Sequence, residues 1–328
     1  METFIFALNA VLPLILIVAI GYFLKKKGFI DTEFAKRANR LVFNFFLPPL
    51  LFLNVYKIED ISRVDGGYIV YGVAMLLAGF FVAIPLVMAF TKEAPRRGVL
   101  LQASFRSNLA YVGIPVAMSL FGESGSAAAS ILSAAFIPIY NVLAVVSLSM
   151  FNTGSEKPNF KKILTGIAKN PFIRSIFAGF VVLIIRAYFV KYQISFRLSD
   201  IEPLFEVMEM LSRIATPLAL LTLGAQFEFS AVKELKREII FGVLARTAVM
   251  PLVGIGVAYF AFGDIFSGAH FAAFVAAFTT PLAVSTIPMS QEMGGDAKLA
   301  GQLVVWTTIL SVVPQFIAAL LLKAAGIF

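Results

Sequence analysis

Apolar runs of about twenty residues recur from one end of this chain to the other, and they restrict its fold more than any other feature. A helix needs roughly 20 apolar residues to cross about 30 Å of hydrocarbon. The 328 residues are 59% apolar and 14% charged, whereas soluble domains carry about 25% charged residues. The apolar runs leave no room for a sizeable water-soluble domain. The sequence therefore predicts an all-α membrane protein.

Charged or Gly/Pro-rich breaks separate ten apolar segments. They cover residues 4–24, 40–56, 68–90, 99–121, 125–151, 172–190, 204–226, 238–262, 267–292 and 298–322. The long connection at 152–171 divides them into five and five. We therefore expect ten transmembrane helices, with 1–151 and 172–328 as two five-helix halves joined by a cytoplasmic linker.

Most lysine and arginine residues fall in the connections that ten crossings would place on one side of the membrane. Lys25, Arg96 and Lys161 are examples. Because loops rich in Lys and Arg stay in the cytoplasm, this distribution places both termini outside the cell inner (plasma) membrane. Five helices per half also give the halves opposite orientations, which is the inverted-repeat plan of many transporters.

Composition argues against several classes of function. The formal charge of +8 belongs to loops that face anionic lipid, so nucleic-acid binding is not expected. There is no cysteine and one histidine, His270, so we expect no metal site, no cofactor and no enzyme, since catalysis at membrane depth needs a nucleophile with its base or a metal cluster. No nucleotide-binding glycine loop is present, which disfavours direct drive by ATP.

Prolines recur in the same order in the two halves. They pair as Pro48-Pro49 with Pro217, Pro115 with Pro288, and Pro138 with Pro314. Pro115 and Pro288 each follow an isoleucine and precede a glycine by the same number of residues. A single proline in a membrane helix is also explained as a kink. Matched interruptions in the two halves, however, are typical of a transport site.

The fourth segment contains a run that is unusually polar for its depth, from Arg106 to Pro115. Gly113 and Pro115 can interrupt the helix, and proline is favoured in the first turn of a new one. The amides from Val116 onward would then face the break with the positive end of a helix dipole. We expect Asn108 to add a side-chain hydrogen bond.

The ninth segment repeats this chemistry. Its polar residues and prolines are Thr280, Pro281, Ser285, Thr286 and Pro288, and the amides from Met289 onward would be free. Two such helix ends meeting near the bilayer centre would form a dry pocket suited to a carboxylate. The Thr and Ser hydroxyls would supply further hydrogen bonds.

Two charged residues near these breaks have alternative roles. Arg106 either faces a cavity, as intramembrane charges usually do, or extends to the interface about a turn and a half away. Glu292, with Gln291, either binds a coupling ion, H⁺ or Na⁺, or is an interfacial charge at the inner end of its segment. The sequence leaves both choices open.

The chain resembles the auxin efflux carrier family, which includes plant auxin exporters and bacterial permeases for malate and related acids. The resemblance covers essentially the whole chain. It is carried by Asn44 to Phe52, Asn108 to Pro115, Phe121 to Glu123, Ile139 to Asn141, and Thr286 to Pro288. The connection at 152–171 is short, as in the bacterial permeases, so auxin is not the expected substrate.

The resemblance implies ten helices in two inverted repeats, with broken helices four and nine crossing as in the related bile acid:sodium symporters. It implies a scaffold of helices 1, 2, 6 and 7, which often forms a homodimer, and a transport unit of helices 3–5 and 8–10 that moves as an elevator. The residues implied to line the substrate site are Asn108, Pro115, Pro281 and Pro288, with Pro49 and Asn141 nearby.

Three functions remain after this reading. The first is a secondary active transporter of a small organic anion such as a mono- or dicarboxylate. The second is a sodium-coupled symporter of a bulkier amphipathic anion, and the third is a passive channel. The substrate, the coupling ion and the direction of transport are not determined by the sequence.

Overall fold

The computed structural model describes residues 2–57, 66–151, 165 and 168–328. Within those ranges the secondary structure is helical, with no strand, which confirms the all-α class. All ten predicted apolar segments are helical over most of their length. Most of the predicted linker at 152–171 lies outside the described residues.

Helices of the first half follow the predicted segments closely. They are α1 (Glu2–Lys26), α2 (Thr32–Leu41), η1 (Val42–Phe46), α3 (Leu47–Tyr56), α4 (Gly66–Phe90), α5 (Ala94–Phe105), η3 (Leu109–Gly113) and α6 (Ile114–Phe151). α6 bends at Phe121 and Gly122, and the glycine has a φ of 59°, a conformation that residues with a side chain rarely adopt. This bend separates the predicted fourth and fifth segments.

The second half has the same succession of long and interrupted helices. They are α8 (Pro171–Lys191), η4 (Leu198–Asp200), α9 (Glu202–Gln226), α10 (Ala231–Glu234), α11 (Lys236–Leu244), η5 (Ala245–Val249), α12 (Met250–Phe262), α13 (Gly268–Thr279), α14 (Thr286–Glu292), α15 (Ala297–Leu310) and α16 (Val312–Ala324). Pro171 is the first residue of α8, where its missing N–H costs nothing.

Three π-helical segments precede prolines at the same offset. η1, η3 and η5 end two residues before Pro48, Pro115 and Pro251. A proline offers no N–H to the carbonyl four residues earlier, and its ring crowds that carbonyl. The helix instead forms wider bonds just before the proline, as from the Ile114 N–H to the Leu109 oxygen. These prolines therefore widen a turn without ending the helix.

Six helical stretches in the described residues are long and apolar enough to cross a membrane. They are Thr32–Tyr56, Gly66–Phe90, Ala94–Phe151, Pro171–Lys191, Lys236–Phe262 and Ala297–Ala324, and Gly268–Thr279 is a shorter apolar helix. The chain is thus a multi-pass membrane protein. The count of ten crossings stays a prediction.

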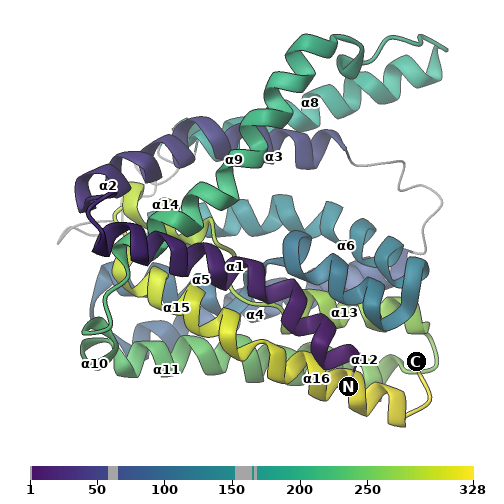
Figure 1. Ribbon diagram of the computed structural model, residues 1–328. Coiled ribbons are helices and arrows are strands. Elements are labelled where there is room, and N and C mark those ends of the chain that lie inside the picture. The colour runs from purple at the N-terminus through teal and green to yellow at the C-terminus, as the bar shows by residue number, and fades with distance from the viewer. Residues whose placement is uncertain (1, 58–65, 152–164, 166–167) are drawn as a thin grey trace.

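Helices of the two halves pack against each other in an exchanged pattern (Figure 1). α1 lies on α9, and α3 lies on α8. α1 and α9 approach so closely that a Cβ on Gly224 would stand 1.9 Å from the Val18 carbonyl oxygen, and a Cβ on Gly21 would stand 2.0 Å from the Leu221 oxygen. Small residues permit such backbone contact, which drives helix association in lipid.

The chain leaves helical geometry at two places within apolar segments. Residues 106–108 separate α5 from η3, and residues 280–285 separate α13 from α14. The second break begins at Thr280 as expected. The first was predicted at Gly113–Pro115, and this position is wrong, because η3 accommodates Pro115 and the polar residues before it unwind instead.

Candidate functional site

The two breaks are joined by a backbone hydrogen bond. The Asn108 N–H donates to the Pro281 oxygen over 2.8 Å. η3 crosses α13 at Gly113, where a Cβ would lie 2.8 Å from the Ala276 oxygen. Gly113 therefore belongs to the crossing, which has no space for a larger residue.

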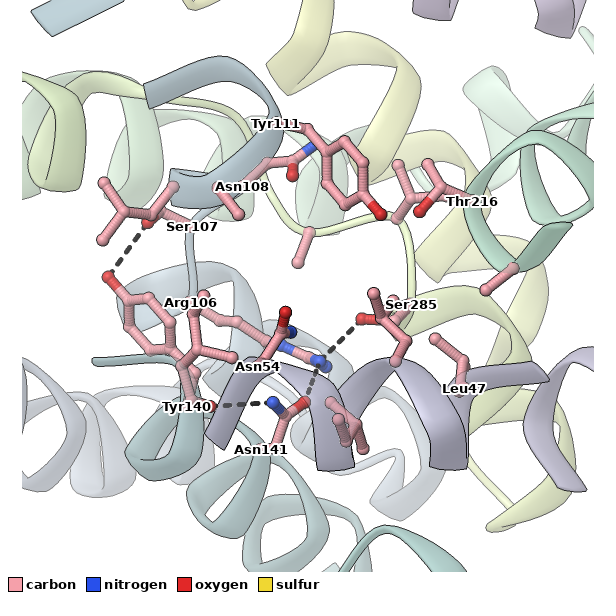
Figure 2. Close-up of a pocket in the computed structure, with 18 of the residues that line it drawn as sticks. Leu47, Asn54, Arg106, Ser107, Asn108, Tyr111, Tyr140, Asn141, Thr216 and Ser285 are labelled. Atoms are coloured by element: carbon pink, nitrogen blue, oxygen red, sulfur yellow. Dashed lines mark hydrogen bonds between the residues drawn. The ribbon is translucent and has the colours of Figure 1, made fainter. Parts of the chain in front are cut away.

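A pocket lies where this crossing faces α3 and α9 (Figure 2). Its lining residues come from α3, the first break, η3, α6, α9 and the second break, and include Leu47, Asn54, Arg106, Ser107, Asn108, Tyr111, Tyr140, Asn141, Thr216 and Ser285. Its cavity volume is about 70 Å³, against the roughly 10–15 Å³ that one water molecule needs. The pocket therefore has room for several waters or a small solute.

Arg106 lines this pocket with only 2% of its surface exposed. Nη2 donates to Asn141 Oδ1 over 2.8 Å and to Ser285 Oγ over 2.7 Å, and Nη1 donates to Gln102 Oε1 over 2.8 Å. No carboxylate of the described residues forms an ion pair with it. The guanidinium is positioned by neutral groups, and its charge remains uncompensated.

Asn108 contributes a hydrogen-bond donor that has no partner in the described part of the chain. The residue is 6% exposed and lines the pocket. Its Nδ2 has no hydrogen-bond partner among the described residues. A buried amide donor without a partner costs about 1–3 kcal/mol, so a ligand atom that accepts this bond would bind favourably.

The start of η3 also brings backbone donors beside the pocket. Ala110 and Tyr111 line it, and their N–H groups form no backbone bond in the described structure, since the first N–H groups of η3 that bond to Asn108 are those of Val112 and Gly113. The prediction of free amides from Val116 and from Met289 onward was wrong. Val116 lies inside α6, and the Met289 N–H donates to the Ser285 oxygen.

Four predicted site residues line the pocket, namely Arg106, Asn108, Asn141 and Ser285. The others lie behind it or beside it: Pro49, Gly113, Pro115, Thr280, Pro281, Thr286 and Pro288 are not among the lining residues. Thr286 helps to position Arg106, because its Oγ1 lies 3.5 Å from Arg106 Nη1. Pro288 falls in the first turn of α14, as expected, whereas Pro115 follows η3 within a continuous helix.

Glu292 and Gln291 lie at the end of α14, against α2. Glu292 pairs with Arg40 over 3.4 Å. Gln291 Oε1 accepts a hydrogen bond from Asn39 Nδ2 over 3.0 Å, and its Nε2 donates to the Lys36 oxygen. These contacts join α14 to α2, and a role of Glu292 or Gln291 in ion coupling stays a prediction.

Sequence reasoning missed the pocket residues of the facing helices. Asn54 of α3 and Thr216 of α9 belong to segments that were considered only for their prolines, and Tyr140, whose hydroxyl lies 2.9 Å from Ser107 Oγ, was noted only as part of a motif. The available sequence signal for these pocket residues was the presence of Asn54 and Thr216 in the segments that contain Pro48-Pro49 and Pro217. Only the packing of α3 and α9 over the break identifies them.

Comparison with known proteins places the chain among transporters. Residues 6–318 match the family described as "Membrane transport protein". An uncharacterized transporter of Methanocaldococcus jannaschii is 28% identical over 73% of each chain. One of Methanothermobacter thermautotrophicus is 22% identical over 93% of this chain and 95% of its own.

A third relative has a name that mentions a substrate. It is a protein of Rhizobium meliloti called "Putative malonate transporter", 23% identical over 92% of this chain and 91% of its own. The family match covers nearly the whole chain, and it agrees with the resemblance found in the sequence. The chain belongs to the membrane transport protein family, the auxin efflux carrier-like group of transporters, and not to a family of enzymes.

Proposed function

We propose that this transporter is a secondary carrier of a small organic anion, a mono- or dicarboxylate, which binds in the pocket at the crossing of the two breaks. The observation that carries the proposal is Arg106, a buried guanidinium that lines the pocket without an acidic partner. An isolated buried charge is costly, and buried charges in proteins are normally paired. A carboxylate would supply the missing partner.

Surrounding groups favour an anion over a cation or a neutral solute. Asn108 Nδ2 and the Ala110 and Tyr111 amides are all donors. None of the nineteen lining residues is Asp or Glu. Ser285, next to α14, adds a hydroxyl that already holds Arg106 in position. A carboxylate has only acceptors, so it matches this set of donors.

The name of the Rhizobium meliloti relative gives one candidate within this class. Malonate is a small dicarboxylate, and a cavity of about 70 Å³ favours small anions over bulky amphipathic ones. The pocket size is the reason to prefer a small acid to the larger substrates of a bile acid-type symporter. We therefore choose malonate as the first probe.

An elevator motion of inverted repeats remains our proposal for the mechanism. It is supported by the exchanged packing of α1 on α9 and α3 on α8, as a two-fold relation between halves requires. It is also supported by the pocket walls, because α3 and α9 cover one side and the crossing forms the other. The start of α1 and the end of α16 lie at the same end of the molecule (Figure 1), which fits an even number of crossings.

We further propose that both termini lie outside the plasma membrane and that the scaffold helices form a homodimer. The scaffold comprises α1, α2 with α3, α8 and α9. α8 presents large apolar side chains, including Phe177 and Ile184, each 69% exposed. Lipid or a second scaffold would cover this face.

Uptake into proteoliposomes tests the proposal. We expect saturable uptake of radioactive malonate that is accelerated by unlabelled malonate inside the vesicles, because counterflow requires a carrier with alternating access. Linear, unsaturable flux without counterflow would instead indicate a channel. If no mono- or dicarboxylate is transported or raises the Tm of the purified protein, the proposed substrate class is wrong.

A further inference from the structure

Arg246 is a second fully buried guanidinium, and it lies outside the pocket. It belongs to η5 and is 0% exposed. Nε donates to the Thr280 oxygen over 2.8 Å, Nη2 to the Ala277 oxygen over 2.8 Å, and Nη1 to the Phe105 oxygen over 3.2 Å. All three acceptors are backbone carbonyls at the ends of α5 and α13.

These carbonyls are available because the two helices end there. Phe105 is the last residue of α5, and Thr280 is the C-cap of α13. The Ala277 oxygen would normally bond to the N–H of residue 281, but that residue is a proline and has none. The sequence of the second break thus creates an acceptor that only an outside donor or a cation can satisfy.

The charge of Arg246 is balanced by helix ends instead of by an acid. No ion pair to it occurs among the described residues. Each helix C-terminus carries about half a negative charge, so the two ends together offset roughly one positive charge. Arg106 differs, because its guanidinium donates to the side chains of Gln102, Asn141 and Ser285 and not to converging helix-end carbonyls.

Converging carbonyls at half-helix ends are the groups that coordinate a sodium ion in many carriers with broken helices. We propose that the Arg246 guanidinium occupies this cation position permanently, so that the crossing is held together, and transport proceeds, without bound sodium. The proposal concerns the coupling ion of the transporter proposed above. Of the two tests below, the uptake test depends on that function, whereas the Tm test does not.

Two measurements test the role of Arg246. In the first, the Tm of purified Arg246→Ala is compared with added guanidinium, sodium or choline chloride at equal low concentration. We expect a lower Tm than wild type, with at least about half of the loss recovered with guanidinium and a smaller recovery with sodium. Wild type and the control Arg186→Ala, which removes a guanidinium that donates to the Tyr56 carbonyl on the scaffold, should shift by no more than about 1 °C between these salts.

The second measurement is malonate uptake by wild-type proteoliposomes in sodium or choline. We expect rates within about twofold of each other, since a fixed charge needs no ion. Arg246→Lys keeps the charge without the planar fork, so its malonate uptake rate should also be the same in sodium and in choline. It serves as the test variant if Arg246→Ala does not fold.

Several results would overturn the inference. One is wild-type uptake or Tm that rises with sodium but not with choline. Another is an Arg246→Ala protein whose Tm responds to neither guanidinium nor sodium, because Arg246 would then be a packing residue only. Absence of malonate uptake in every salt would refute malonate as the substrate, while the Tm comparison would still decide the role of Arg246.

Discussion

Replacing Arg106 with glutamine tests the proposed anion site most directly. Arg106→Gln removes the charge and keeps a polar side chain near Asn141 and Ser285. In the described structure Nη1 and Nη2 already bond to protein, and Nε is the nitrogen left for a ligand. One charge-assisted hydrogen bond is worth about 1.5–3 kcal/mol. At about 1.4 kcal/mol per tenfold, the Kd for malonate should rise by about 10- to 150-fold.

Titration calorimetry on purified protein would measure this Kd, with Tm measured in parallel to show that the variant is folded. Arg106→Lys should fall between wild type and Arg106→Gln, because it keeps the charge but not the fork. Arg213→Gln is the matched control, since Arg213 is on α9 but its side chain is 77% exposed and pairs with Glu209. A Kd for folded Arg106→Gln within about threefold of wild type would refute the role given to this charge.

Three further substitutions distinguish a residue that binds the substrate from residues that stabilise the fold. Asn108→Ala should lower malonate uptake by about 5-fold or more, which is the value of one hydrogen bond. Its Tm should change little, because Nδ2 has no partner to lose among the described residues. Normal uptake by this variant would remove Asn108 from the site. Gly113→Ala should cost about 1–3 kcal/mol of stability by overpacking, because its Cβ would lie 2.8 Å from the Ala276 oxygen. An unchanged Tm would contradict this expectation and show that η3 and α13 can move apart. Gly224→Ala should lower Tm through the 1.9 Å approach to the Val18 oxygen but leave the malonate Kd of the folded protein unchanged, as titration of that variant would show.

The apolar pattern alone was sufficient to predict most of the helices. Each predicted segment is helical over most of its length, because a chain in lipid must satisfy every backbone group internally and a helix does so locally. The polar run from Arg106 to Pro115 and the Thr280-Pro281 pair also identified the two segments that are interrupted, although not the residues at which the first one unwinds, since polar residues and proline at membrane depth need a local reason. Arg106, Asn108 and Ser285 were found in this way, whereas Asn141 was implied by the family resemblance.

Where each helix unwinds was not visible in the sequence. Pro115 looked like the point of interruption, yet η3 accommodates it by wider hydrogen bonds, and the chain unwinds upstream at Arg106. A proline restricts its neighbours but does not decide whether a helix breaks or widens. That choice depends on partners such as the Pro281 oxygen, which accepts the Asn108 N–H from the other half of the chain.

The sequence by itself determined that this protein is a helical membrane transporter with polar interruptions in matching segments, because hydrophobic length and polar exceptions are local properties of a chain in lipid. Only the tertiary structure decided which polar groups share a pocket and which serve the frame. Arg106 and Arg246 look alike in sequence, as single charges in apolar segments. Arg246 faces two carbonyl ends and is balanced, whereas Arg106 faces a cavity and neutral groups, and this difference arises from contacts between residues far apart in the chain.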